Sequence, residues 1–474
     1  MTLDPQTLSQ LKDIGGDAGC LSEPDQMEPF VHDVRGAAAG RAGVVLRPAS
    51  TEDAARMVRV CTEHGVSMVP HGGNTGYMGA SIPDGSGRQA VVSLARLNRI
   101  RELDARNFTI TVEAGCILEH IQRAAEEAER LFPLTLGAQG SCQIGGNLST
   151  NAGGTNVLRY GNARELVLGL EVVLPDGRVW NGLRGLRKDN TGYNLKQLFL
   201  GAEGTLGIIT AAVLKLFPPP QHTAVAMVAV RDPAAAVDLL SHLRASTGDL
   251  VSGFEYMHGS ALEMARRNLP GTELPLPGHE HTVLVEVSGA SPDTDLDDVT
   301  ERALAAAFEQ GWVLDAVVAS SLAQQRDFWQ LREHLPEAQM REGARILFDV
   351  SVPVSAVPEF LERGRAIAHS VDEDILVSPF GHVGDGNIHF DLVQPSAMAR
   401  DDFLALSPTV SERINGLIAE LGGSFSAEHG IGRGKRETLA RYRDPVEIEL
   451  MRSIKSALDP RNLMNPGVLL PDAA

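Results

Sequence analysis

The stretch "LGAQGSCQIGGNLSTNAGG" at residues 136–154 interleaves glycine with serine, threonine and asparagine, which is more than a simple turn requires. Glycine lets the main chain approach a ligand and lets successive N–H groups converge on an anion, while hydroxyl and amide side chains add donors. Three other segments share this character: "PHGGNTGYMG" (70–79), "RYGNARELV" (159–167) and "LGAEGTLGIIT" (200–210). One such cluster alone is usually a tight turn. Four of them together indicate a bound nucleotide that carries a diphosphate.

Two common nucleotide-binding folds do not fit these clusters. No GxGxxG opens a β-α-β unit with an acidic residue about twenty positions later, which excludes the Rossmann dinucleotide fold. The segment "GIGRGK" at 430–435 lacks the GxxxxGK[ST] spacing of a P-loop. The nucleotide therefore requires a different architecture.

The composition narrows the class of protein. With 474 residues, 43% of them hydrophobic and 22% charged, the chain is globular and long enough for about two or three domains. The 42 basic and 61 acidic residues give a net charge of −19, which would repel nucleic acid. The four cysteines, Cys20, Cys61, Cys116 and Cys142, form no CxxC pair, so we expect reduced thiols and no cysteine-ligated iron–sulfur cluster. The N-terminus has no signal-like apolar run and no stretch reaches membrane-spanning length, so the sequence predicts a cytoplasmic location without an integral membrane segment.

Local patterns predict an α+β organisation. "STEDAARMVRVCTEH" (50–64) begins with the capping signature Ser50-x-x-Asp53 and continues with apolar residues at helical spacing. Three consecutive prolines at 218–220 break any regular element, so we place a domain boundary there. Beyond them, residues 222–257 and 281–319 each show a β-α-β pattern. Two such units are typical of a ferredoxin-like layer.

A second set of chemical groups lies near the C-terminus. "SPFGHVGDGNIHFDL" (378–392) holds His382 and His389 on either side of a Gly-Asp-Gly, and "AEHG" (427–430) follows. A turn at the glycines lets the two imidazoles converge, and Glu428 could supply a carboxylate from a neighbouring strand. Two imidazoles and a carboxylate with an open position are suited to a catalytic Zn²⁺ or Mn²⁺. A lone histidine is more often a hydrogen-bonded surface residue, but three in a glycine-rich setting favour the metal.

The motifs as a set resemble a known family. "PHGGNTGYMGASIPDG", "GAQGSCQIGGNLSTNAGG", "RYGNARELVLGLEVVLPDGRV" and "FLGAEGTLGIIT" resemble the FAD-binding domain of the vanillyl-alcohol-oxidase/PCMH-type flavoenzymes. "GHVGDGNIH", "EHGIG" and "DPRNLMNPG" resemble the branch that holds D-2-hydroxyglutarate dehydrogenase, D-lactate dehydrogenase and the glycolate oxidase flavin subunit. The resemblance runs from about residue 40 to the C-terminus.

The resemblance implies a fold with four parts. They are an N-terminal helical segment (1–40), a two-subdomain PCMH-type FAD-binding domain (41–220), a ferredoxin-like α+β substrate or cap domain (221–425), and a C-terminal segment (426–474). The C-terminal segment would complete the active site and return a helix to the FAD domain.

The same resemblance implies which residues hold FAD. The pyrophosphate loop would be Pro70, Gly72, Gly73, Asn74, Thr75 and Gly76. The isoalloxazine ring and ribityl chain would be lined by Gly140, Ser141, Gly145, Gly146, Asn147, Thr150, Asn151, Ala152 and Gly153. The adenosine side would be taken by Glu203, Gly207 and Ile209, and Asn465 would close over the ring from the C-terminal helix. Relatives that bind FAD covalently use a histidine just after the double glycine, and Asn74 in that place predicts non-covalent FAD.

The remaining site roles follow from the resemblance in the same way. His382, His389 and Glu428 match metal ligands, Asn387 matches a substrate contact, and His429 matches the proton acceptor. Arg332 matches the arginine that binds a substrate carboxylate, and its guanidinium fork suits that task. Alternatively, Arg332 pairs with Glu333 or Glu337 on a solvated helix.

These roles predict oxidation of a D-2-hydroxy acid to a 2-oxo acid, with D-2-hydroxyglutarate first among the substrates. A metal would lower the pKa of the hydroxyl, a histidine would accept its proton, and flavin N5 would take the hydride. Leu347 stands where that branch usually has a lysine, two positions before "DVSVP", although Arg345 could compensate from an extended strand. D-lactate, another D-2-hydroxy acid and glycolate therefore stay open as substrates, as does a non-catalytic flavin-binding module. The partners expected are an electron acceptor such as electron-transfer flavoprotein or a quinone, and a second copy in a homodimer.

Overall fold

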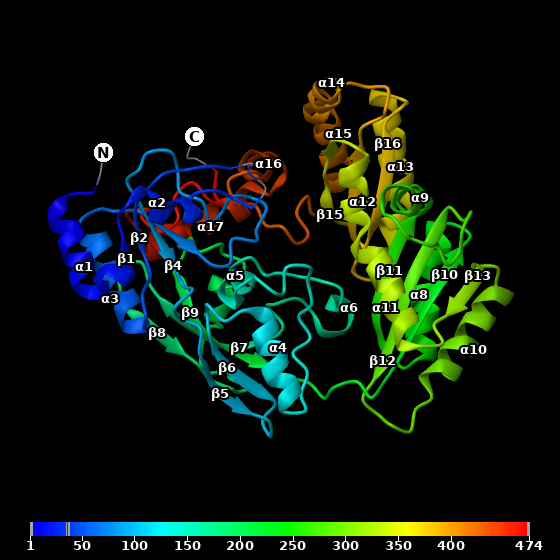
Figure 1. Cartoon of the computed structure of the whole chain (residues 1–474), viewed down its shortest axis with the longest axis horizontal. Helices are drawn as coiled ribbons and strands as arrows, with labels where there is room; N and C mark the ends of the chain where they lie inside the picture. Colours follow the sequence, from blue (N-terminus) through cyan, green and yellow to red (C-terminus); the bar gives the residue numbers. More distant parts are fainter. Residues whose placement is uncertain (1–2, 35, 37, 472–474) are drawn as a thin grey trace. The chain divides into compact units, whose positions relative to one another are not determined.

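Three β-sheets organise the part of the chain that the computed structural model describes, residues 3–34, 36 and 38–471 (Figure 1). The chain divides into two compact units, which are described separately. The first comprises residues 1–153, 162–219 and 429–474, and the second comprises residues 154–161 and 220–428. Residues 1, 2, 35 and 37 of the predicted N-terminal segment and 472–474 of the C-terminal segment lie outside the described residues.

The first sheet of the first unit has four strands in the order β1-β2-β4-β3. Its strands β2, β3 and β4 are parallel, and β1 is antiparallel to β2. Helix α3 packs on this sheet, and the Ser50 hydroxyl caps it by accepting the Asp53 N–H at 3.0 Å, as the sequence predicts. The bounds are β1 Cys20–Leu21, β2 Ala42–Leu46, β3 Met68–His71, β4 Gln89–Ser93, α1 Pro5–Gly19, α2 Pro24–Met27, η1 Glu28–Phe30 and α3 Thr51–Glu63.

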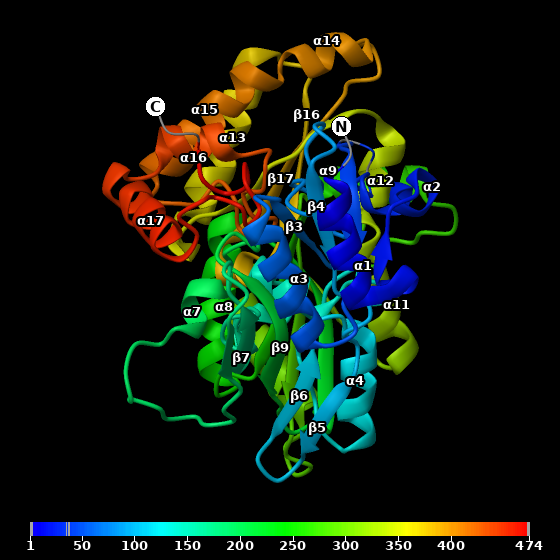
Figure 2. The same ribbon diagram turned by 90° about the vertical axis from the view of Figure 1, so that its left-hand side faces the viewer.

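The second sheet of the first unit has five antiparallel strands in the order β5-β6-β9-β7-β8. Figure 2 labels β5, β6, β7 and β9 of this sheet, with α4 beside β5 and β6. A Pro-Asp-Gly turn joins β7 to β8, and the Leu174 N–H donates to the Arg178 carbonyl across it at 2.8 Å. The bounds are β5 Ile100–Asp104, β6 Thr109–Glu113, β7 Val167–Val173, β8 Val179–Gly182, β9 Ile208–Lys215, α4 Leu118–Glu127, α5 Ile144–Ser149 and α7 Lys196–Phe199.

The C-terminal helices α16 (Arg436–Tyr442) and α17 (Pro445–Leu458) belong to the first unit. The buried Lys455 ammonium of α17 donates to the Asp459 carboxylate at 2.6 Å and to the Thr205 and Met464 carbonyls at 2.8 and 2.6 Å. A buried cation is tolerated only when it is paired and hydrogen-bonded. This contact therefore fixes the C-terminal segment against the loop before β9.

The second unit begins with the predicted ferredoxin-like layer. Its strands follow the order β13-β10-β12-β11, in which β10 is antiparallel to both of its neighbours. This is the order that two β-α-β units give when they interlock, so the predicted α+β fold class is confirmed. The bounds are β10 His222–Val230, α8 Pro233–Ser246, β11 Val251–His258, α9 Gly259–Asn268, β12 His281–Gly289, α10 Leu296–Glu309 and β13 Val313–Val318.

Further strands extend this sheet beyond β11. Strand β16 pairs with β11, β17 pairs with β16, and the short strands β14 and β15 both pair with β17. The bounds are β14 Arg345–Ile346, β15 Asp349–Ser351, β16 Leu376–Gly381, β17 Asn387–Val393, α6 Val157–Tyr160, α11 Leu322–Glu333, α12 Leu335–Glu342, η2 Val354–Ala356, α13 Val357–Val371, η3 Val383–Asp385, α14 Arg400–Ala405 and α15 Ser407–Glu420.

Helices cover both faces of this sheet. In β10, Ala226 and Val228 belong to the core formed with α8 and α10, whereas Val225 and Met227 belong to a second core with α9, α11 and α12. Because side chains alternate along a strand, a strand covered on both faces is apolar at nearly every position. This explains the unbroken apolar run "AVAMVAV". Within the described residues, no helix is long and apolar enough to cross a membrane.

Candidate active site

The hairpin between β16 and β17 brings two histidine rings together. His382 follows β16 and His389 lies in β17, and their ring centroids are 5.6 Å apart at an interplanar angle of 75°. The bend depends on Gly386, which has φ of +84° and would place a Cβ atom 2.1 Å from the Val352 carbonyl oxygen. Only glycine combines this left-handed backbone with such a close approach.

Glu428 lies close to the two histidines and belongs to an irregular segment of the chain. The prediction that it lies on a neighbouring strand is wrong, because residues 425–430 belong to no strand and the preceding Ser424 makes a single bridge, to Ser351. The segment is held by the Glu428 N–H, which donates to the Asp349 carboxylate at 2.9 Å. Glu428 Oε1 lies 3.8 Å from His382 Nε2, and one ligand atom each of His382, His389 and Glu428 falls within 4.8 Å of the others. This donor set fits a divalent metal with two nitrogen ligands and one oxygen ligand.

A buried carboxylate that the sequence analysis did not select lies behind His382. Glu255 of β11 is 1% exposed, and its two oxygens lie 2.6 Å from His382 Nδ1 and 2.7 Å from Arg332 Nε. Arg332 therefore pairs with Glu255, and the predicted alternatives Glu333 and Glu337 are wrong. Burial opposes ionisation of Glu255, but the charges of His382 and Arg332 lower its pKa to about 2. Burial also disfavours the charged form of His382 and by itself would lower its pKa. The Glu255 carboxylate raises this pKa to about 9.

The contact between Glu255 and His382 has a definite chemical effect. A carboxylate that accepts a hydrogen bond from one ring nitrogen fixes the ring and directs the other nitrogen toward a metal. Here Nδ1 is engaged by Glu255, so Nε2 is the nitrogen that faces Glu428. The only signal for Glu255 in the sequence is an acidic residue within the apolar strand "VSGFEYM".

Asp349 is the second buried carboxylate that the sequence analysis missed. It lies in β15, is 4% exposed, and accepts the Asn387 side-chain amide at 3.1 Å as well as the Glu428 N–H. Asn387 also donates to the Val350 carbonyl at 2.9 Å, which uses both of its amide hydrogens. Its buried Oδ1 has no partner among the described residues. Burial raises the pKa of Glu428 to about 7, against the opposing charge of His382 and with the added repulsion of Asp349.

The predicted FAD residues all lie in the first unit, mostly in loops at strand and helix ends. Pro70 is in β3, and the loop after β3 holds Gly72, Gly73, Asn74, Thr75 and Gly76. Gly140 and Ser141 form the turn before α5, which itself holds Gly145, Gly146 and Asn147 and is followed by Thr150, Asn151, Ala152 and Gly153. Glu203 and Gly207 precede β9, which holds Ile209.

These glycine-rich segments pack directly on one another. A Cβ atom on Gly73 would lie 2.4 Å from the Ser141 carbonyl oxygen, so the loops at 70–76 and 140–146 touch backbone to backbone. A Cβ atom on Gly204 would lie 2.9 Å from Pro70 Cγ, which brings the third segment to the same place. Segments far apart in the sequence therefore form one cluster of main-chain groups.

Buried polar atoms in this cluster fit a bound FAD. Within the described residues, Gln143 Oε1, Asn147 Oδ1 and Asn465 Oδ1 are buried without a hydrogen-bond partner. Each buried acceptor left without a partner costs about 1–3 kcal/mol. A flavin nucleotide carries N–H and hydroxyl donors that could satisfy such acceptors, so the residues present fit this cofactor.

Two of the predicted FAD residues are also used to hold the protein together. The Glu203 carboxylate accepts the backbone N–H groups of Ile431 and Gly432, each at 2.7 Å. The Asn465 amide donates to the Ala80 and Glu203 carbonyls at 3.0 and 2.8 Å. The prediction that Asn465 extends from the C-terminal helix is wrong, because α17 ends at Leu458 and Asp459 turns the chain by accepting the N–H groups of the residues four and five positions later.

Asn74 determines how FAD would be attached. Its amide donates to the His32 carbonyl at 2.7 Å and accepts the Ser81 hydroxyl at 3.1 Å, and it offers no nucleophile for a flavin bond. We therefore expect all yellow colour to enter the supernatant when the purified protein is precipitated with acid. Absorbance of the supernatant and of the washed pellet measures the two fractions, and a pellet that retains flavin would contradict the prediction.

The remaining predicted residues lie as follows. His429 begins the return of the chain to the first unit, and its ring packs edge-on against Tyr77 with centroids 4.7 Å apart. Leu347, which is 41% exposed, lies between β14 and β15 and outside any strand. Arg345 is therefore not on a continuous strand with it, and its guanidinium donates to the Pro336 carbonyl at 3.1 Å.

Comparison with known proteins shows the family and the fold of the chain. Residues 42–182 match the family model described as FAD binding domain, and residues 219–469 match the one described as FAD linked oxidases, C-terminal domain. Among solved structures, p-cresol methylhydroxylase with substrate bound has a TM-score of 0.74 at 18% identity, covering 98% of this chain and 96% of that one. The 4-ethylphenol oxidase of Gulosibacter chungangensis has a TM-score of 0.73 at 18% identity with the same coverage. The fold is therefore the predicted PCMH type, and the class is that of the FAD-linked oxidoreductases.

Curated relatives narrow the class. D-2-hydroxyglutarate dehydrogenase of Xanthomonas citri pv. viticola is 39% identical, over 89% of this chain and 88% of the relative. The mitochondrial D-2-hydroxyglutarate dehydrogenases of Bos taurus and Arabidopsis thaliana are 37% and 34% identical, over 96% and 99% of this chain and 81% and 82% of theirs. The chain belongs to the D-2-hydroxyglutarate dehydrogenase family of FAD-linked oxidoreductases. The resemblance that the motifs indicate is thereby confirmed.

Proposed function

We propose that this protein oxidises D-2-hydroxyglutarate to 2-oxoglutarate with FAD and a divalent metal. The observation that carries the proposal is the meeting of His382, His389 and Glu428 in a chain of this family. A non-catalytic flavin-binding module would not need such a set of metal ligands. Relatives with the name D-2-hydroxyglutarate dehydrogenase support this choice of substrate.

The two bound groups would supply the redox and Lewis-acid chemistry: FAD accepts a hydride, and the metal lowers the pKa of a hydroxyl that it coordinates. His382, His389 and Glu428 would hold the metal, with Zn²⁺ first and Mn²⁺ second by donor type. Glu255 would keep His382 in the orientation and tautomer that a ligand needs. The glycine-rich loops of the first unit would hold FAD in the manner predicted from the sequence.

Three further residues would act on the substrate. His429 would accept the hydroxyl proton. Arg332 would bind a carboxylate through its terminal nitrogens, because its Nε already donates to Glu255. Asn387 would offer its free Oδ1 to a substrate donor, since both amide hydrogens are used.

One observation favours a second candidate substrate. Leu347 replaces the expected lysine, and the Arg345 guanidinium is bonded to the Pro336 carbonyl. Without a lysine at position 347, a 2-hydroxy acid with an uncharged side chain would lose no ion pair that a diacid could form there. D-lactate is therefore the second candidate.

An anaerobic titration tests both candidates. We expect D-2-hydroxyglutarate to bleach the visible flavin band, D-lactate to do so at higher concentration, and the L-enantiomers to have no effect. Stopped-flow absorbance gives the rate and the apparent affinity for each acid. A flavin that stays oxidised with every 2-hydroxy acid would refute the proposal.

Other properties complete the proposal. The reduced flavin would pass its electrons to a separate acceptor such as electron-transfer flavoprotein or a quinone, and the chain would form a homodimer. A cytoplasmic location stays a prediction from the sequence.

A further inference from the structure

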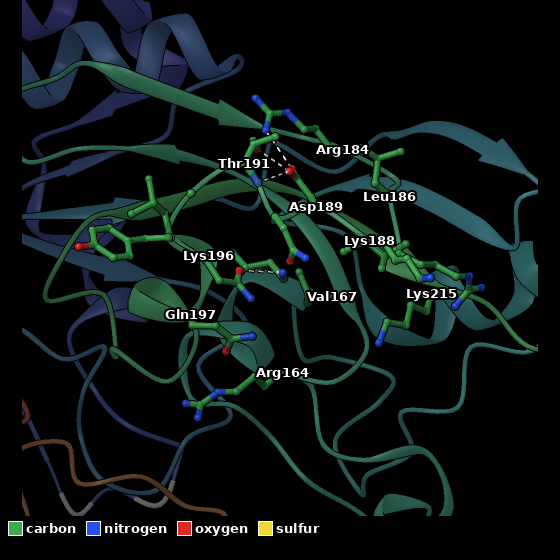
Figure 3. A pocket seen from close by; sticks show the side chains of 18 of the residues that line it. Arg164, Val167, Arg184, Leu186, Lys188, Asp189, Thr191, Lys196, Gln197 and Lys215 are labelled. Atoms are coloured by element: carbon green, nitrogen blue, oxygen red, sulfur yellow. Dashed lines mark hydrogen bonds and ion pairs between the residues drawn. The ribbon is translucent and has the colours of Figure 1, made fainter.

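A large hollow lies in the first unit on the side of β8 and α7. It has a volume of about 960 Å³ and is lined by the start of β7, by β8, by the segment 183–195, by α7 and by the end of β9 (Figure 3). None of its lining residues belongs to the predicted FAD or metal set. The proposed reaction therefore does not account for it.

The hollow is basic although the chain is acidic. The whole chain has 42 basic and 61 acidic residues, but the lining has six basic residues against Glu165 and Asp189. The six come from three separate stretches of the chain: Arg164, Arg184, Arg187, Lys188, Lys196 and Lys215. Such a reversal of sign concentrates positive potential at one place and would steer a negatively charged partner there.

The protein itself leaves much of this charge unneutralised. Asp189 is occupied by Arg184 Nη1 at 3.1 Å and by Thr191, as Figure 3 shows. Within the described residues, the side chains of Arg187 and Lys188 have no ion-pair or hydrogen-bond partner. Burial lowers the pKa of Lys215, and the charges of Arg187 and Lys196 lower it further, against the opposing charge of Glu165. An anionic group in the hollow would relieve their repulsion.

The rim of the hollow carries exposed apolar side chains. Tyr193 is 95% exposed and Leu186 is 56% exposed, both on the segment 183–195. Tyrosine and arginine are enriched where proteins bind one another, whereas small-molecule pockets are mostly apolar inside with few polar groups. The combination of charged floor and apolar rim is typical of a protein interface.

Arg164 connects the hollow with a predicted flavin loop. Its backbone N–H donates to Asn151 Oδ1 at 2.9 Å, and its Nη2 donates to the Leu200 carbonyl at 3.0 Å. Asn151 is one of the residues expected to line the isoalloxazine and ribityl chain. A partner in the hollow would therefore be separated from that loop by a single side chain.

We propose that this basic hollow is the docking surface for an acidic electron-carrying protein that reoxidises the flavin. The inference rests on the proposed function, because a dehydrogenase must dispose of two electrons in each turnover. One reduced flavin would reduce two one-electron carriers, with oxidised flavin restored and the protons released to water. Within the described residues, the four cysteines are free and buried, so they offer the electrons no redox-active disulfide.

The shape and charge favour an acidic protein over other occupants. A flat anionic membrane would leave a concave recess of this volume unfilled, while a projecting acidic loop would enter it. Elsewhere the net negative charge of the chain would repel an acidic protein, so complementarity at this one place supplies orientation as well as affinity.

The test uses the soluble haem domain of cytochrome b5, an acidic one-electron carrier, as the probe. We expect the Arg187→Glu/Lys188→Glu variant to bind oxidised cytochrome at least about tenfold more weakly than the wild type, with haem reduction slowed by a similar factor. The matched control is Arg88→Glu, an exposed arginine before β4, which should bind as the wild type does. Binding of the wild type should also weaken steeply as salt is raised.

Several results would overturn the docking proposal. The first is that the double variant and the control bind the cytochrome equally well. The second is that inorganic phosphate binds tightly and displaces the cytochrome, and the third is that anionic vesicles bind the protein more strongly than the cytochrome does. The fourth is that the wild type is a dimer and the double variant is not. Anaerobic flavin bleaching by D-2-hydroxyglutarate should be unchanged in the double variant. If D-2-hydroxyglutarate does not bleach the flavin of the wild type, the proposed reaction is refuted instead. Binding of the cytochrome to the protein without substrate would still test the docking proposal.

Discussion

Removing bound divalent metal with a chelator is expected to slow flavin reduction by D-2-hydroxyglutarate at least about a hundredfold while FAD stays bound. The expected decrease in rate follows from the Lewis-acid effect of the metal, which is worth several kcal/mol. Each 1.4 kcal/mol in the activation free energy changes a rate about tenfold. FAD should remain because its predicted residues lie in the first unit, whereas His382, His389 and Glu428 lie in the second. Stopped-flow bleaching measures the loss, and added Zn²⁺ or Mn²⁺ should restore the rate.

A substitution separates metal loss from side effects of the chelator. His389→Ala should reproduce the chelated protein and should not recover when metal is added. The matched control is His369→Ala, an exposed histidine in the last turn of α13, which should behave as the wild type does. Full activity in protein shown to be metal-free by elemental analysis would contradict the metal role.

The sequence was sufficient for the ferredoxin-like layer because its signals are local. In "HTAVAMVAV" seven consecutive residues are apolar, and in "HTVLVEVSG" the valines recur at every second position. The helices α8 and α10 begin at the capping residues Asp232 and Asp295. Each element could be recognised from its own residues. Two interlocking β-α-β units then leave few arrangements in one sheet.

The parts of the site that were missed depend on contacts distant in sequence. Glu255 and His382 are separated by 127 positions, and Asp349 meets the Glu428 N–H across 79 positions. No local pattern distinguishes a carboxylate buried with such a partner from one that faces solvent. Glu428 was misplaced on a strand for the same reason, since its position is set by Asp349 rather than by a period in "SFSAEHG".

Glu255 offers the most informative single substitution in the second unit. Its carboxylate serves a metal-directed histidine and a buried arginine at once. Glu255→Gln keeps the shape but removes the charge, and one of its two oxygens becomes an N–H₂ group that faces a donor. We expect divalent-metal affinity to fall about 10–100-fold, the usual effect of losing a carboxylate behind a ligand histidine.

The same substitution should also lower the free energy of unfolding. Arg332 and Glu255 have side chains 8% and 1% exposed, and breaking a buried pair of this kind costs about 3–5 kcal/mol because the remaining charge is left without a counter-ion. Urea unfolding followed by circular dichroism measures this loss, and competition with a metal-binding dye measures the affinity.

The chain supplies a closely matched control in Glu280. This carboxylate also contacts a histidine and an arginine, with Oε1 3.3 Å from His258 Nε2 and 3.1 Å from Arg365 Nη1, but its side chain is 58% exposed. Exposed pairs contribute about 0–1 kcal/mol, so Glu280→Gln should change unfolding by no more than that and should leave metal affinity intact. If Glu255→Gln proved as harmless as Glu280→Gln, then the buried carboxylate would neither orient His382 nor neutralise Arg332. Both carboxylates contact a histidine and an arginine. The expected difference between the two variants in unfolding free energy and metal affinity therefore measures the effect of burying such a group.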